Sequence, residues 1–423
     1  MKIKLILAFF IFKLGFAQHR TCGMEQQMQR IMADPQLKEQ YLDLQQQFEN
    51  ELQRLSNSNE SKSTAATIRI PVAVHYPSVV ASATNASLRS CLILLAQKQV
   101  AILNADYNAT NSDLSNWVND QDFYPDTNYG NMNVVFEIAT LNHPTGTGLG
   151  FPTNGNPAIT FGTDFLSNAD TDSTWAGYCN LVVRNLTSGI LGYSPLGGSP
   201  SSGMTVVIDN NSFSTSLSGS PSACLGYVPS PPFNLGRTLT HELGHFFNLD
   251  HTFKACDGSN CATSGDKVCD TPSADTPYYN CDPSGSVSTN CGTTQLTMNY
   301  MDYVEDSCMY MFTQGQVNRM TAWSNIIGSQ LNMNTLANNE FINTNFSIVP
   351  NPSKGIFSIQ LKEQIGNYSV SIIDSLGREI YNMDFNQNSD LIQSIQIDNA
   401  LSGLYFVTIK SNGATLTKKI LVK

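Results

Sequence analysis

Three of the six histidines of this 423-residue chain lie within eleven residues, in the segment HELGHFFNLDH at positions 241–251. If the segment begins as a helix, His241 and His245 project from the same face, since they are four residues apart. His251 joins them only if the helix ends near Asn248 and the chain turns back. Asparagine is one of the few non-glycine residues that tolerate the left-handed backbone of such a turn. The segment therefore predicts a helix, a tight turn and three imidazoles directed at one point.

Three imidazoles at this spacing are typical of a catalytic zinc site, which takes three protein ligands and keeps a fourth position for water. Glu242 follows His241 directly, close to the ion but better placed to accept a proton from a water than to bind the metal. The HExxH pattern alone also occurs in proteins without metal, and His251 alone could be a surface histidine. The three histidines, with a turn-forming residue between them, favour a zinc site with Glu242 as its base.

The composition excludes some classes of partner. The chain has 23 Lys and Arg against 34 Asp and Glu, a net charge of −11 and a pI of about 4.9. It has no Lys/Arg-rich run, so we expect no nucleic-acid partner and no electrostatic docking on anionic membranes. Ten cysteines are typical of an oxidising compartment, provided that the chain is exported.

The N-terminus has the features of an export signal. Residues 1–4 (MKIK) are basic, residues 5–12 are apolar, and residues 15–17 (GFA) form a small-x-small cleavage site. The apolar run is far shorter than the roughly 20 residues that cross a bilayer, and no later run approaches that length. We therefore expect a signal peptide over residues 1–17, no transmembrane segment and a secreted protein. A buried N-terminal helix is the alternative.

Residues 26–55 are rich in Gln, Glu and Leu, and their apolar positions predict a helix that is broken near Pro35. The polar, aperiodic residues 56–67 predict a linker. A helical arm on an accessible linker suits a removable pro-segment, which we place at residues 18–62. A helical extension that stays packed on the domain is the alternative.

From residue 68 the pattern alternates between strands and helices. Strands are predicted at residues 68–76, 133–141, 181–184 and 204–209, and a long helix at residues 88–107. This order predicts an α/β fold with a mainly parallel sheet, in a domain over residues 63–340. Within it, residues 252–301 are dense in Cys, Gly, Asp and Pro, and such a region needs cross-links or metals to hold its shape. After residue 345, short alternating segments separated by turns predict a small all-β sandwich over residues 341–423.

The segment HELGHFFNLDH resembles the HExxHxxGxxH motif of the metzincin metallopeptidases, which is paired with a downstream methionine turn. Residues 297–316 (TMNYMDYVEDSCMYMFTQGQ) resemble that turn in the pappalysin family, and residues 234–240 (NLGRTLT) and 102–107 (ILNADY) are also similar to this family. The resemblance extends from about residue 68 to residue 320. It departs from the motif at Asn248, where the family usually has glycine.

The resemblance implies a metzincin-like catalytic domain: a twisted, mostly parallel sheet with an active-site helix and an irregular, disulfide-rich lower part. It implies a secreted zinc endopeptidase that hydrolyses peptide bonds of protein substrates by a zinc-bound water activated by Glu242. Met301 would lie beneath the metal, and the Tyr303 hydroxyl would donate to the developing oxyanion. A non-catalytic surface or adhesive protein on the same scaffold is the alternative, against which the intact Glu242 argues.

The C-terminal segment resembles the sorting domain of the bacterial type IX secretion system. The matching features are VPNPSKGIF, IIDSLGREI, LSGLYFVTIK and the terminal KKILVK. The resemblance implies the type IX secretion machinery as a partner. A β-sandwich that binds substrate or carbohydrate is the alternative.

The cysteines divide into three groups. Cys91 lies in an apolar predicted helix, where we expect a buried free thiol, and Cys22 belongs to the pro-segment. The other eight permit four bridges whose connectivity the sequence leaves open: Cys179, Cys224, Cys256, Cys261, Cys269, Cys281, Cys291 and Cys308. The family resemblance favours Cys281–Cys308 and a bridge from Cys256 or Cys261 to Cys291.

Residues 20–23 (RTCG) resemble a cysteine-switch segment, in which the Cys22 thiolate would bind the zinc and displace the catalytic water. A disulfide partner is the alternative role for Cys22. Asp266 and Asp270 lie in a loop with exposed carbonyls, where the family often carries structural calcium. The alternative there is an acidic loop that is merely solvated.

The family resemblance also places the chain after Met301 along the S1′ pocket, which holds the side chain that follows the scissile bond. A carboxylate at the base of this pocket would favour Arg or Lys. Asp306 is preferred to Glu305 because its position matches the pocket-floor acid of the family. Two solvated loop charges are the alternative. Cleavage before Lys62 would then be a plausible self-activation step.

Overall fold

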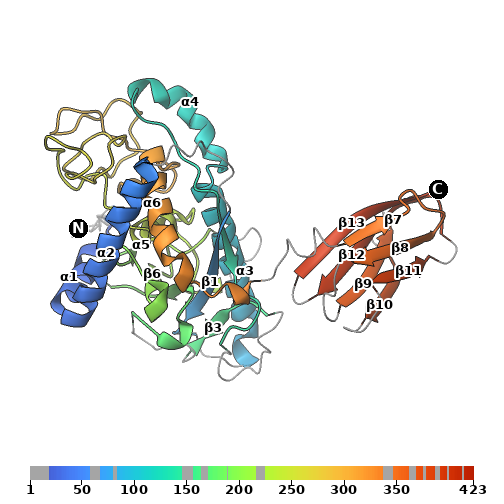
Figure 1. The fold of residues 1–423 in the computed structure, drawn as a ribbon. Helices are drawn as coiled ribbons and strands as arrows, with labels where there is room; N and C mark the ends of the chain where they lie inside the picture. The colour runs from blue at the N-terminus through green and yellow to red at the C-terminus, as the bar shows by residue number, and fades with distance from the viewer. Residues whose placement is uncertain are drawn as a thin grey trace, which may run out of the picture.

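The computed structural model describes residues 19–57, 67–79, 83–144, 156–162, 170–187, 189–215, 224–336, 346–361, 368–374, 378–385, 391–397, 400–411 and 414–423. The predicted signal peptide and Lys62 lie outside these residues. Figure 1 shows an N-terminal unit of helices around a sheet and a C-terminal unit built of strands.

Two helices precede the sheet: α1 (Met24–Ala33) and α2 (Pro35–Asn57). They are separate because a residue before proline is disfavoured in the helical conformation, and Asp34 is extended there, with φ −90° and ψ 118°. The Asp34 carboxylate accepts hydrogen bonds from the backbone N–H groups of Gln36 and Leu37, at 2.9 and 3.0 Å, and so caps α2. The break predicted near Pro35 is therefore present.

The sheet of the N-terminal unit is mostly parallel, as the sequence predicts. Its strands among the described residues are β1 (Ile68–Tyr76), β2 (Val134–Ile138), β3 (Ile159–Phe161), β4 (Cys179–Arg184), β5 (Gly192–Tyr193) and β6 (Thr205–Asp209). The order is β2-β1-β4-β6-β5, with β3 also on β1, and only the pairing of β5 with β6 is antiparallel. Strand β1 is buried from Ile70 onward, which is typical of a parallel strand covered on both faces.

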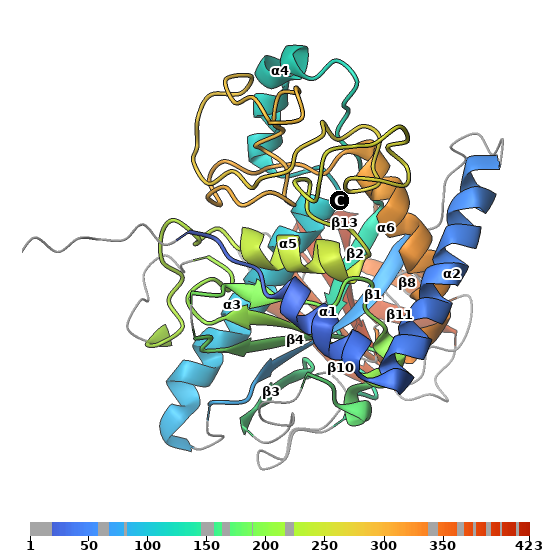
Figure 2. The same ribbon diagram turned by 90° about the vertical axis from the view of Figure 1, so that its left-hand side faces the viewer.

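Three longer helices share the main core with this sheet: α3 (Ala86–Tyr107), α5 (Arg237–Phe246) and α6 (Gln314–Ile327) (Figure 2). A short helix, α4 (Trp117–Asp120), follows α3. By length and composition alone, residues Ala86–Phe123 would suffice to cross a membrane. However, α3 buries Leu92, Leu95 and Leu103 in the main core, which is typical of the core helix of a domain.

The chain between α5 and α6 is a long loop region without α-helix or β-strand, drawn in yellow in Figure 2. Three disulfides cross-link it: Cys256–Cys291, Cys261–Cys269 and Cys281–Cys308. The structure thus forms the bridge expected for Cys308, and it pairs Cys256 rather than Cys261 with Cys291. Cross-links supply the rigidity that this region cannot obtain from backbone ladders.

Two predictions about cysteines are wrong. Cys91 is not a free thiol, because it forms a disulfide with Cys224, 133 residues away, with the Cα atoms 5.6 Å apart. Helix α3 turns this edge of its apolar face toward Tyr227 and Cys224, which belong to the same core, and a contact so distant in sequence leaves no local signal. Cys179, expected in a bridge, is a free buried thiol in β4. Its side chain lies among apolar core residues, and burial raises its pKa to about 12.

The C-terminal unit is the all-β sandwich that the sequence predicts. One sheet has the order β10-β9-β12-β13 and the other β11-β8-β7, with every pair antiparallel. The strands are β7 (Phe346–Val349), β8 (Ile356–Leu361), β9 (Tyr368–Asp374), β10 (Glu379–Phe385), β11 (Ile392–Gln396), β12 (Gly403–Ser411) and β13 (Ala414–Val422). Alternate residues of β9, among them Val370 and Ile372, fill a separate core.

Candidate metal centre

Helix α5 is held in place by buried polar contacts at its first turns. Tyr107 at the end of α3 donates its hydroxyl proton to the carbonyl of Thr240, at 3.0 Å. Asp106 accepts a hydrogen bond from the Thr240 hydroxyl at 2.6 Å and forms an ion pair with Arg237. Asp113 also pairs with Arg237, at 2.9 Å. The segment ILNADY, similar to the family in sequence, therefore fixes the position of the helix that carries His241 and His245.

The turn after α5 forms at the predicted residue. Asn248 has φ 69°, in the left-handed region. The backbone N–H of Asn248 donates to the carbonyl of His245 at 2.8 Å, and the N–H of Leu249 donates to the carbonyl of Gly244 at 3.0 Å. These bonds reverse the chain and bring His251 back onto the helix face that carries the other two histidines.

The three imidazoles converge. The Nε2 atom of His245 lies 3.2 Å from Nε2 of His241 and 3.1 Å from Nε2 of His251. All three side chains are buried. Burial lowers the pKa of His245 to about 4, and burial together with the neighbouring imidazoles lowers the pKa values of His241 and His251 well below the usual value. The rings are therefore neutral near pH 7.

The second nitrogens of two rings are fixed by backbone carbonyls. The Nδ1 atom of His241 lies 2.7 Å from the carbonyl oxygen of Tyr300, and Nδ1 of His245 lies 2.7 Å from that of Leu249. Because the Nδ1–H groups donate there, the Nε2 atoms carry lone pairs that face one another. Neighbouring lone pairs in a buried space are satisfied by a cation, so this donor set fits Zn²⁺.

Met301 lies directly against the helix, as the family resemblance implies. A Cβ atom at Gly244 would lie 2.4 Å from the Met301 sulfur, so only glycine permits this approach. The backbone N–H of Met301 donates to the Asn299 side chain at 2.9 Å, and Asn299 in turn exchanges hydrogen bonds with Gln316 of α6. The methionine turn is thereby tied to α6.

Cys22 and Glu242 lie together beside the histidines. The Cys22 sulfur and the ligand nitrogens of His241, His245 and His251 all lie within 4.8 Å of one another. The thiol also donates to Glu242 Oε2 at 3.3 Å. Burial, opposed by Cys22 and Arg20, raises the pKa of Glu242 to about 8.

Tyr303 completes the group. The backbone N–H of Cys22 donates to the Tyr303 hydroxyl at 3.4 Å, and the Tyr303 ring centroid lies 5.0 Å from that of His251. Burial raises the pKa of the Tyr303 phenol far above its usual value, so its hydroxyl stays protonated. The structure thus brings together seven residues named from the sequence: Cys22, His241, Glu242, His245, His251, Met301 and Tyr303.

Asp306 is buried and holds an arginine that sequence reasoning missed. Its carboxylate lies 2.5 Å from Nη2 of Arg20, and both side chains are almost inaccessible. Arg20 also donates to the carbonyl of Val304 and to the Thr238 hydroxyl, each at 3.2 Å, and it lies over the ring of Phe233. Glu305, in contrast, is half-buried. One signal for this contact was available in the sequence. Arg20 lies two residues before Cys22, so a chain that places Cys22 at the metal centre also brings Arg20 close to Asp306.

Among the described residues, neither Asp266 nor Asp270 belongs to a group of three or more close ligand atoms. Asp266 accepts from the Val268 N–H at 3.0 Å and from the Thr271 hydroxyl at 2.7 Å. Asp270 accepts instead from the Thr313 hydroxyl and the Gly315 N–H, at 2.7 and 2.8 Å, at the start of α6. Asp270 also lines a cavity of about 320 Å³. Calcium binding by these two residues stays a prediction.

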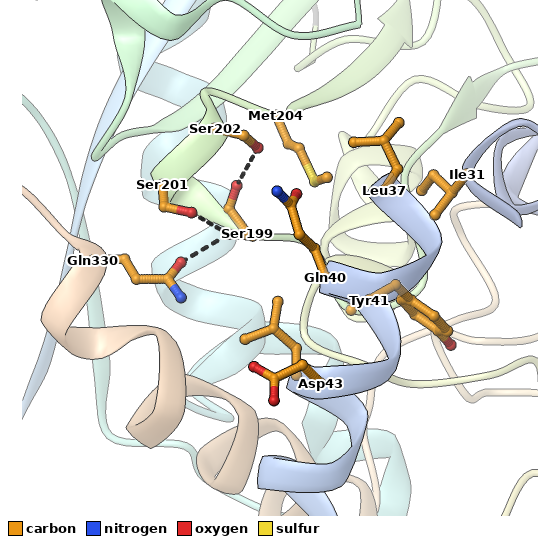
Figure 3. Close-up of a pocket in the computed structure, with 12 residues that line it drawn as sticks. Ile31, Leu37, Gln40, Tyr41, Asp43, Ser199, Ser201, Ser202, Met204 and Gln330 are labelled. Atoms are coloured by element: carbon orange, nitrogen blue, oxygen red, sulfur yellow. Dashed lines mark hydrogen bonds between the residues drawn. The ribbon is translucent and has the colours of Figure 1, made fainter. Parts of the chain in front are cut away.

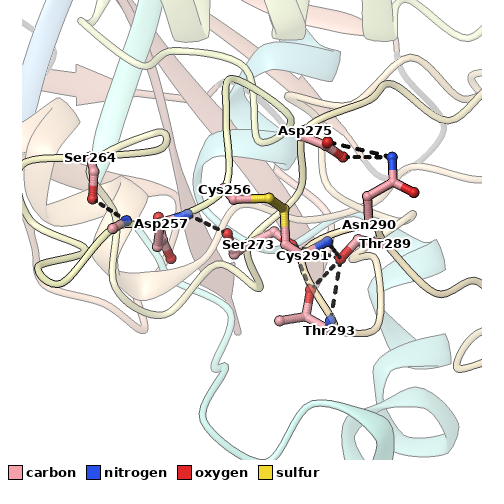
Figure 4. The surroundings of a disulfide bond; sticks show 10 residues. Cys256, Asp257, Ser264, Ser273, Asp275, Thr289, Asn290, Cys291 and Thr293 are labelled. Carbon is pink, nitrogen blue, oxygen red and sulfur yellow. Dashed lines mark hydrogen bonds between the residues drawn. A yellow bond between two sulfur atoms is a disulfide. The ribbon is translucent and has the colours of Figure 1, made fainter.

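A second group of candidate ligand atoms has a structural role. Cys256, Asp275 and Cys291 lie close together in the loop region. However, the two cysteines are joined as a disulfide, and Asp275 accepts hydrogen bonds from the Asn290 amide at 3.2 and 3.4 Å (Figure 4). This group is therefore a cross-link of the loop region.

The mostly parallel sheet, the helix that carries two histidines, the turn after it and the methionine packed against it together form a metzincin-like fold. Residues 164–325 match the family described as pregnancy-associated plasma protein-A, and residues 347–423 match the secretion system C-terminal sorting domain. By the first of these matches, residues 164–325 are similar to the pappalysin metallopeptidases. The sorting domain makes it a secreted protein, as the N-terminus predicts.

Several curated proteins are similar in sequence to this chain over part of their length. Extracellular metalloprotease 1 of Coccidioides posadasii is 40% identical over 151 residues, which are 34% of this chain and 50% of that protein. An extracellular metalloprotease of Colletotrichum graminicola is 42% identical over 96 residues, 23% of this chain and 33% of that protein. The chain thus spans about a third to a half of the length of these relatives.

Two solved structures from Tannerella forsythia are also similar. Mature mirolysin in complex with a cleaved peptide is 26% identical, with a TM-score of 0.45, over 64% of this chain and 100% of that chain. A promirolysin mutant is 28% identical, with a TM-score of 0.48, over 72% of this chain and 93% of that chain.

Proposed function

We propose that this protein is a secreted zinc endopeptidase that is made as a latent precursor and cleaves before Arg or Lys. The observation that carries the proposal is the convergence of three neutral imidazole nitrogens beside the buried carboxylate of Glu242. Zinc bound there would polarise the scissile carbonyl and lower the pKa of a water. The hydrolytic activity of the family and of the extracellular relatives supports the same reaction.

The protein side of the mechanism involves two residues. Glu242 accepts the proton of the attacking water and passes it to the leaving amine, so that no covalent intermediate is needed. Tyr303, with its protonated hydroxyl, donates a hydrogen bond to the oxyanion that develops on the scissile carbonyl.

The proposed specificity rests on the ion pair between the buried Asp306 and Arg20. A substrate arginine in the same place would meet the same carboxylate, the Val304 carbonyl and the Thr238 hydroxyl. A lysine could reach the carboxylate as a point charge, but it lacks the second and third donors of the guanidinium. We therefore expect basic residues at P1′, with Arg ahead of Lys.

Residues 18–62 serve as the latency segment in this proposal. Cys22 forms no disulfide, and its sulfur lies within 4.8 Å of the ligand nitrogens of the three histidines, which supports a role as a fourth ligand. The segment pairs with the edge strand β5: the N–H of Gly23 donates to the carbonyl of Gly192 at 2.9 Å, and the N–H of Leu191 donates to that of Thr21 at 3.0 Å. Substrate would compete with this segment for the same edge. The sorting domain at residues 347–423 supports export by the type IX secretion machinery.

The proposal is tested by digesting a peptide library with the purified enzyme after its linker at residues 58–66 has been cut and the N-terminal segment removed. Each cleaved bond is identified by mass spectrometry, with and without a zinc chelator. We expect cleavage before Arg and, more slowly, before Lys, lost with the chelator and restored by zinc. Cleavage that the chelator leaves undiminished would contradict the zinc mechanism, and aliphatic residues at P1′ would contradict the role of Asp306.

A further inference from the structure

Helix α2 lies along a surface of the metallopeptidase domain that is distinct from the metal centre. In Figures 1 and 2 it runs beside α6. We call the residues that it contacts there the α2 surface: Gly197, Asn248, Arg319, Trp323 and Asn325.

One aromatic side chain of α2 is fully enclosed by this surface. Phe48 is 0% exposed, although its neighbours on either side in the sequence are exposed. Its ring centroid lies 5.6 Å from that of Trp323, and the Arg319 guanidinium carbon lies 4.9 Å from it on the ring face. At the far end of the contact, the Asn325 amide donates to Glu51 at 2.7 Å. Burying a phenylalanine in this way contributes much of the free energy of a contact.

Helix α2 also contacts Asn248, the residue that departs from the family motif. Gln45 and Asn248 form a reciprocal pair of amide hydrogen bonds, at 3.0 and 3.1 Å. Glycine would allow the turn at residue 248 equally well, but it has no side chain to pair with Gln45. Gly197 makes room for the pair, since a Cβ atom there would lie 2.9 Å from Gln45 Nε2. Asparagine at position 248 therefore ties α2 to the turn between two metal ligands.

A cavity adjoins the contact of α2 with the domain, on its N-terminal side. A space of about 370 Å³ lies between the α1–α2 junction and the domain, lined on one side by Leu37, Gln40 and Tyr41 and on the other by Ser199 and Gln330 (Figure 3). Between Cys22 and α2, helix α1 also buries Met24 and Ile31, so the contact of α2 is one of several that hold the N-terminal segment. In the sequence, residues 58–66 follow α2, so a cut there leaves the whole of α2 on the N-terminal fragment.

We propose that α2 is an anchor in its own right, which keeps the N-terminal segment bound to the α2 surface after the linker has been hydrolysed. A single cut at residues 58–66 then gives a non-covalent complex that is still latent. Activity appears only when the segment dissociates or is cut again before Phe48. This inference rests on the proposed role of residues 18–62 in latency.

The test uses the full chain with Glu242→Gln, so that the protein does not cleave itself, and with a recognition sequence for a specific protease in the linker. After the linker is cut, size-exclusion chromatography shows whether the N-terminal fragment elutes with the domain. Titration then gives the dissociation constant of the fragment. We expect co-elution, also in the double variant Arg20→Ala, Cys22→Ala, because the α2 anchor is independent of those residues.

Matched pairs of variants separate the anchor from general effects on α2. Phe48→Ala should raise the dissociation constant by roughly 100-fold or more, while Leu42→Ala, on the exposed side of α2, leaves it unchanged. Gln45→Ala should raise it by about 3- to 10-fold and Gln46→Ala should not. Asn248→Gly keeps the turn and should match Gln45→Ala.

Two results would overturn the inference: an unsubstituted N-terminal fragment that elutes apart from the domain after the linker is cut, or equal dissociation constants for Phe48→Ala and Leu42→Ala. These binding results do not depend on catalysis. A fragment that binds as expected, but leaves wild-type hydrolysis of peptides unaffected, would instead contradict the proposed latency and leave the anchor in place.

Discussion

Arg20 and Asp306 lie 286 residues apart in sequence and form an ion pair of 2.5 Å in which neither side chain is accessible to solvent. The carboxylate also accepts from the backbone N–H groups of Leu235 and Arg237, at 2.8 and 3.3 Å. Taking two charges out of water is costly, and this pair meets that cost with several hydrogen bonds on each partner. The arginine of the N-terminal segment therefore occupies a site built for a guanidinium.

Removing this arginine should destabilise the precursor. In Arg20→Ala the Asp306 charge loses its partner while it stays buried, and we expect a loss of about 3 kcal/mol in the free energy of unfolding. Arg30→Ala is the control, because Arg30 is a largely exposed residue of the same segment whose ion pair with Asp170 should contribute less than about 1 kcal/mol. Denaturant unfolding of the two variants, both with Glu242→Gln, makes the comparison. Equal midpoints would mean that the pair contributes nothing to holding the segment.

Cys22→Ala should weaken latency without loss of metal. The precursor is compared in a background with Lys62→Gln, which blocks the proposed cut in the linker. We expect peptide hydrolysis by the uncut precursor to increase at least about tenfold, since a ligand contact of 1.4 kcal/mol corresponds to that factor. Cys179→Ala, at the other free cysteine of the described residues, should have no such effect. A Cys22→Ala precursor that retains zinc and is as inactive as its parent would contradict the switch.

A buried histidine far from the metal predicts how stability depends on pH. His75 in β1 lies between Thr160 and Asn180, and burial lowers its pKa to about 3. The unfolded chain takes up this proton below about pH 6.5 and the folded chain does not. The contribution of neutral His75 to the free energy of unfolding is therefore complete above pH 6.5. It is lost as the pH falls toward 3, by about 1.4 kcal/mol per pH unit.

His75→Gln offers the comparison, because glutamine can still donate a hydrogen bond but does not titrate. Between pH 6.5 and 4, the free energy of unfolding should fall less steeply with falling pH in the variant. The two slopes should differ by about 1.4 kcal/mol per pH unit, the effect of one proton. Parallel curves for the two proteins would show that His75 does not stay neutral in the fold.

Substitution of Cys91 in α3 should destabilise the protein more than substitution of Cys179 in β4. Cys91→Ser removes the disulfide to Cys224, which spans 133 residues of sequence. We expect it to lower the free energy of unfolding by about 2–5 kcal/mol. Cys179→Ala removes one buried sulfur and should cost about 1 kcal/mol. Non-reducing peptide mapping should find Cys22 and Cys179 as thiols and Cys91 joined to Cys224. A free Cys91 would contradict this part of the structure.

The sequence predicted best where the relevant signal is local. His241, Glu242 and His245 lie on one helix turn, and Asn248 marks the reversal that returns His251, so spacing alone specifies the centre. Strict alternation in the last eighty residues likewise predicted the sandwich, because one face of each strand must be buried.

What the sequence could not predict depends on contacts between distant segments. Nothing near Cys91 indicates Cys224, nothing near Asp306 indicates Arg20, and nothing near Asn248 indicates Gln45. Each pair meets only after α2 and α3 have packed on the sheet and the loop region has been cross-linked. The glycine-to-asparagine departure at position 248 could be noticed in the sequence, but its partner became visible only in the folded chain.

The proposal as a whole is tested most directly by Glu242→Gln, measured for bound zinc and for peptide hydrolysis in the same preparation after removal of the N-terminal segment. Glutamine keeps the shape of the side chain but cannot accept the proton of the attacking water. We predict one zinc per chain in both proteins, and a rate that falls by about 10²–10⁴-fold in the variant. Equal zinc content with an undiminished rate would contradict the assignment of Glu242 as the base and, with it, the proposed mechanism.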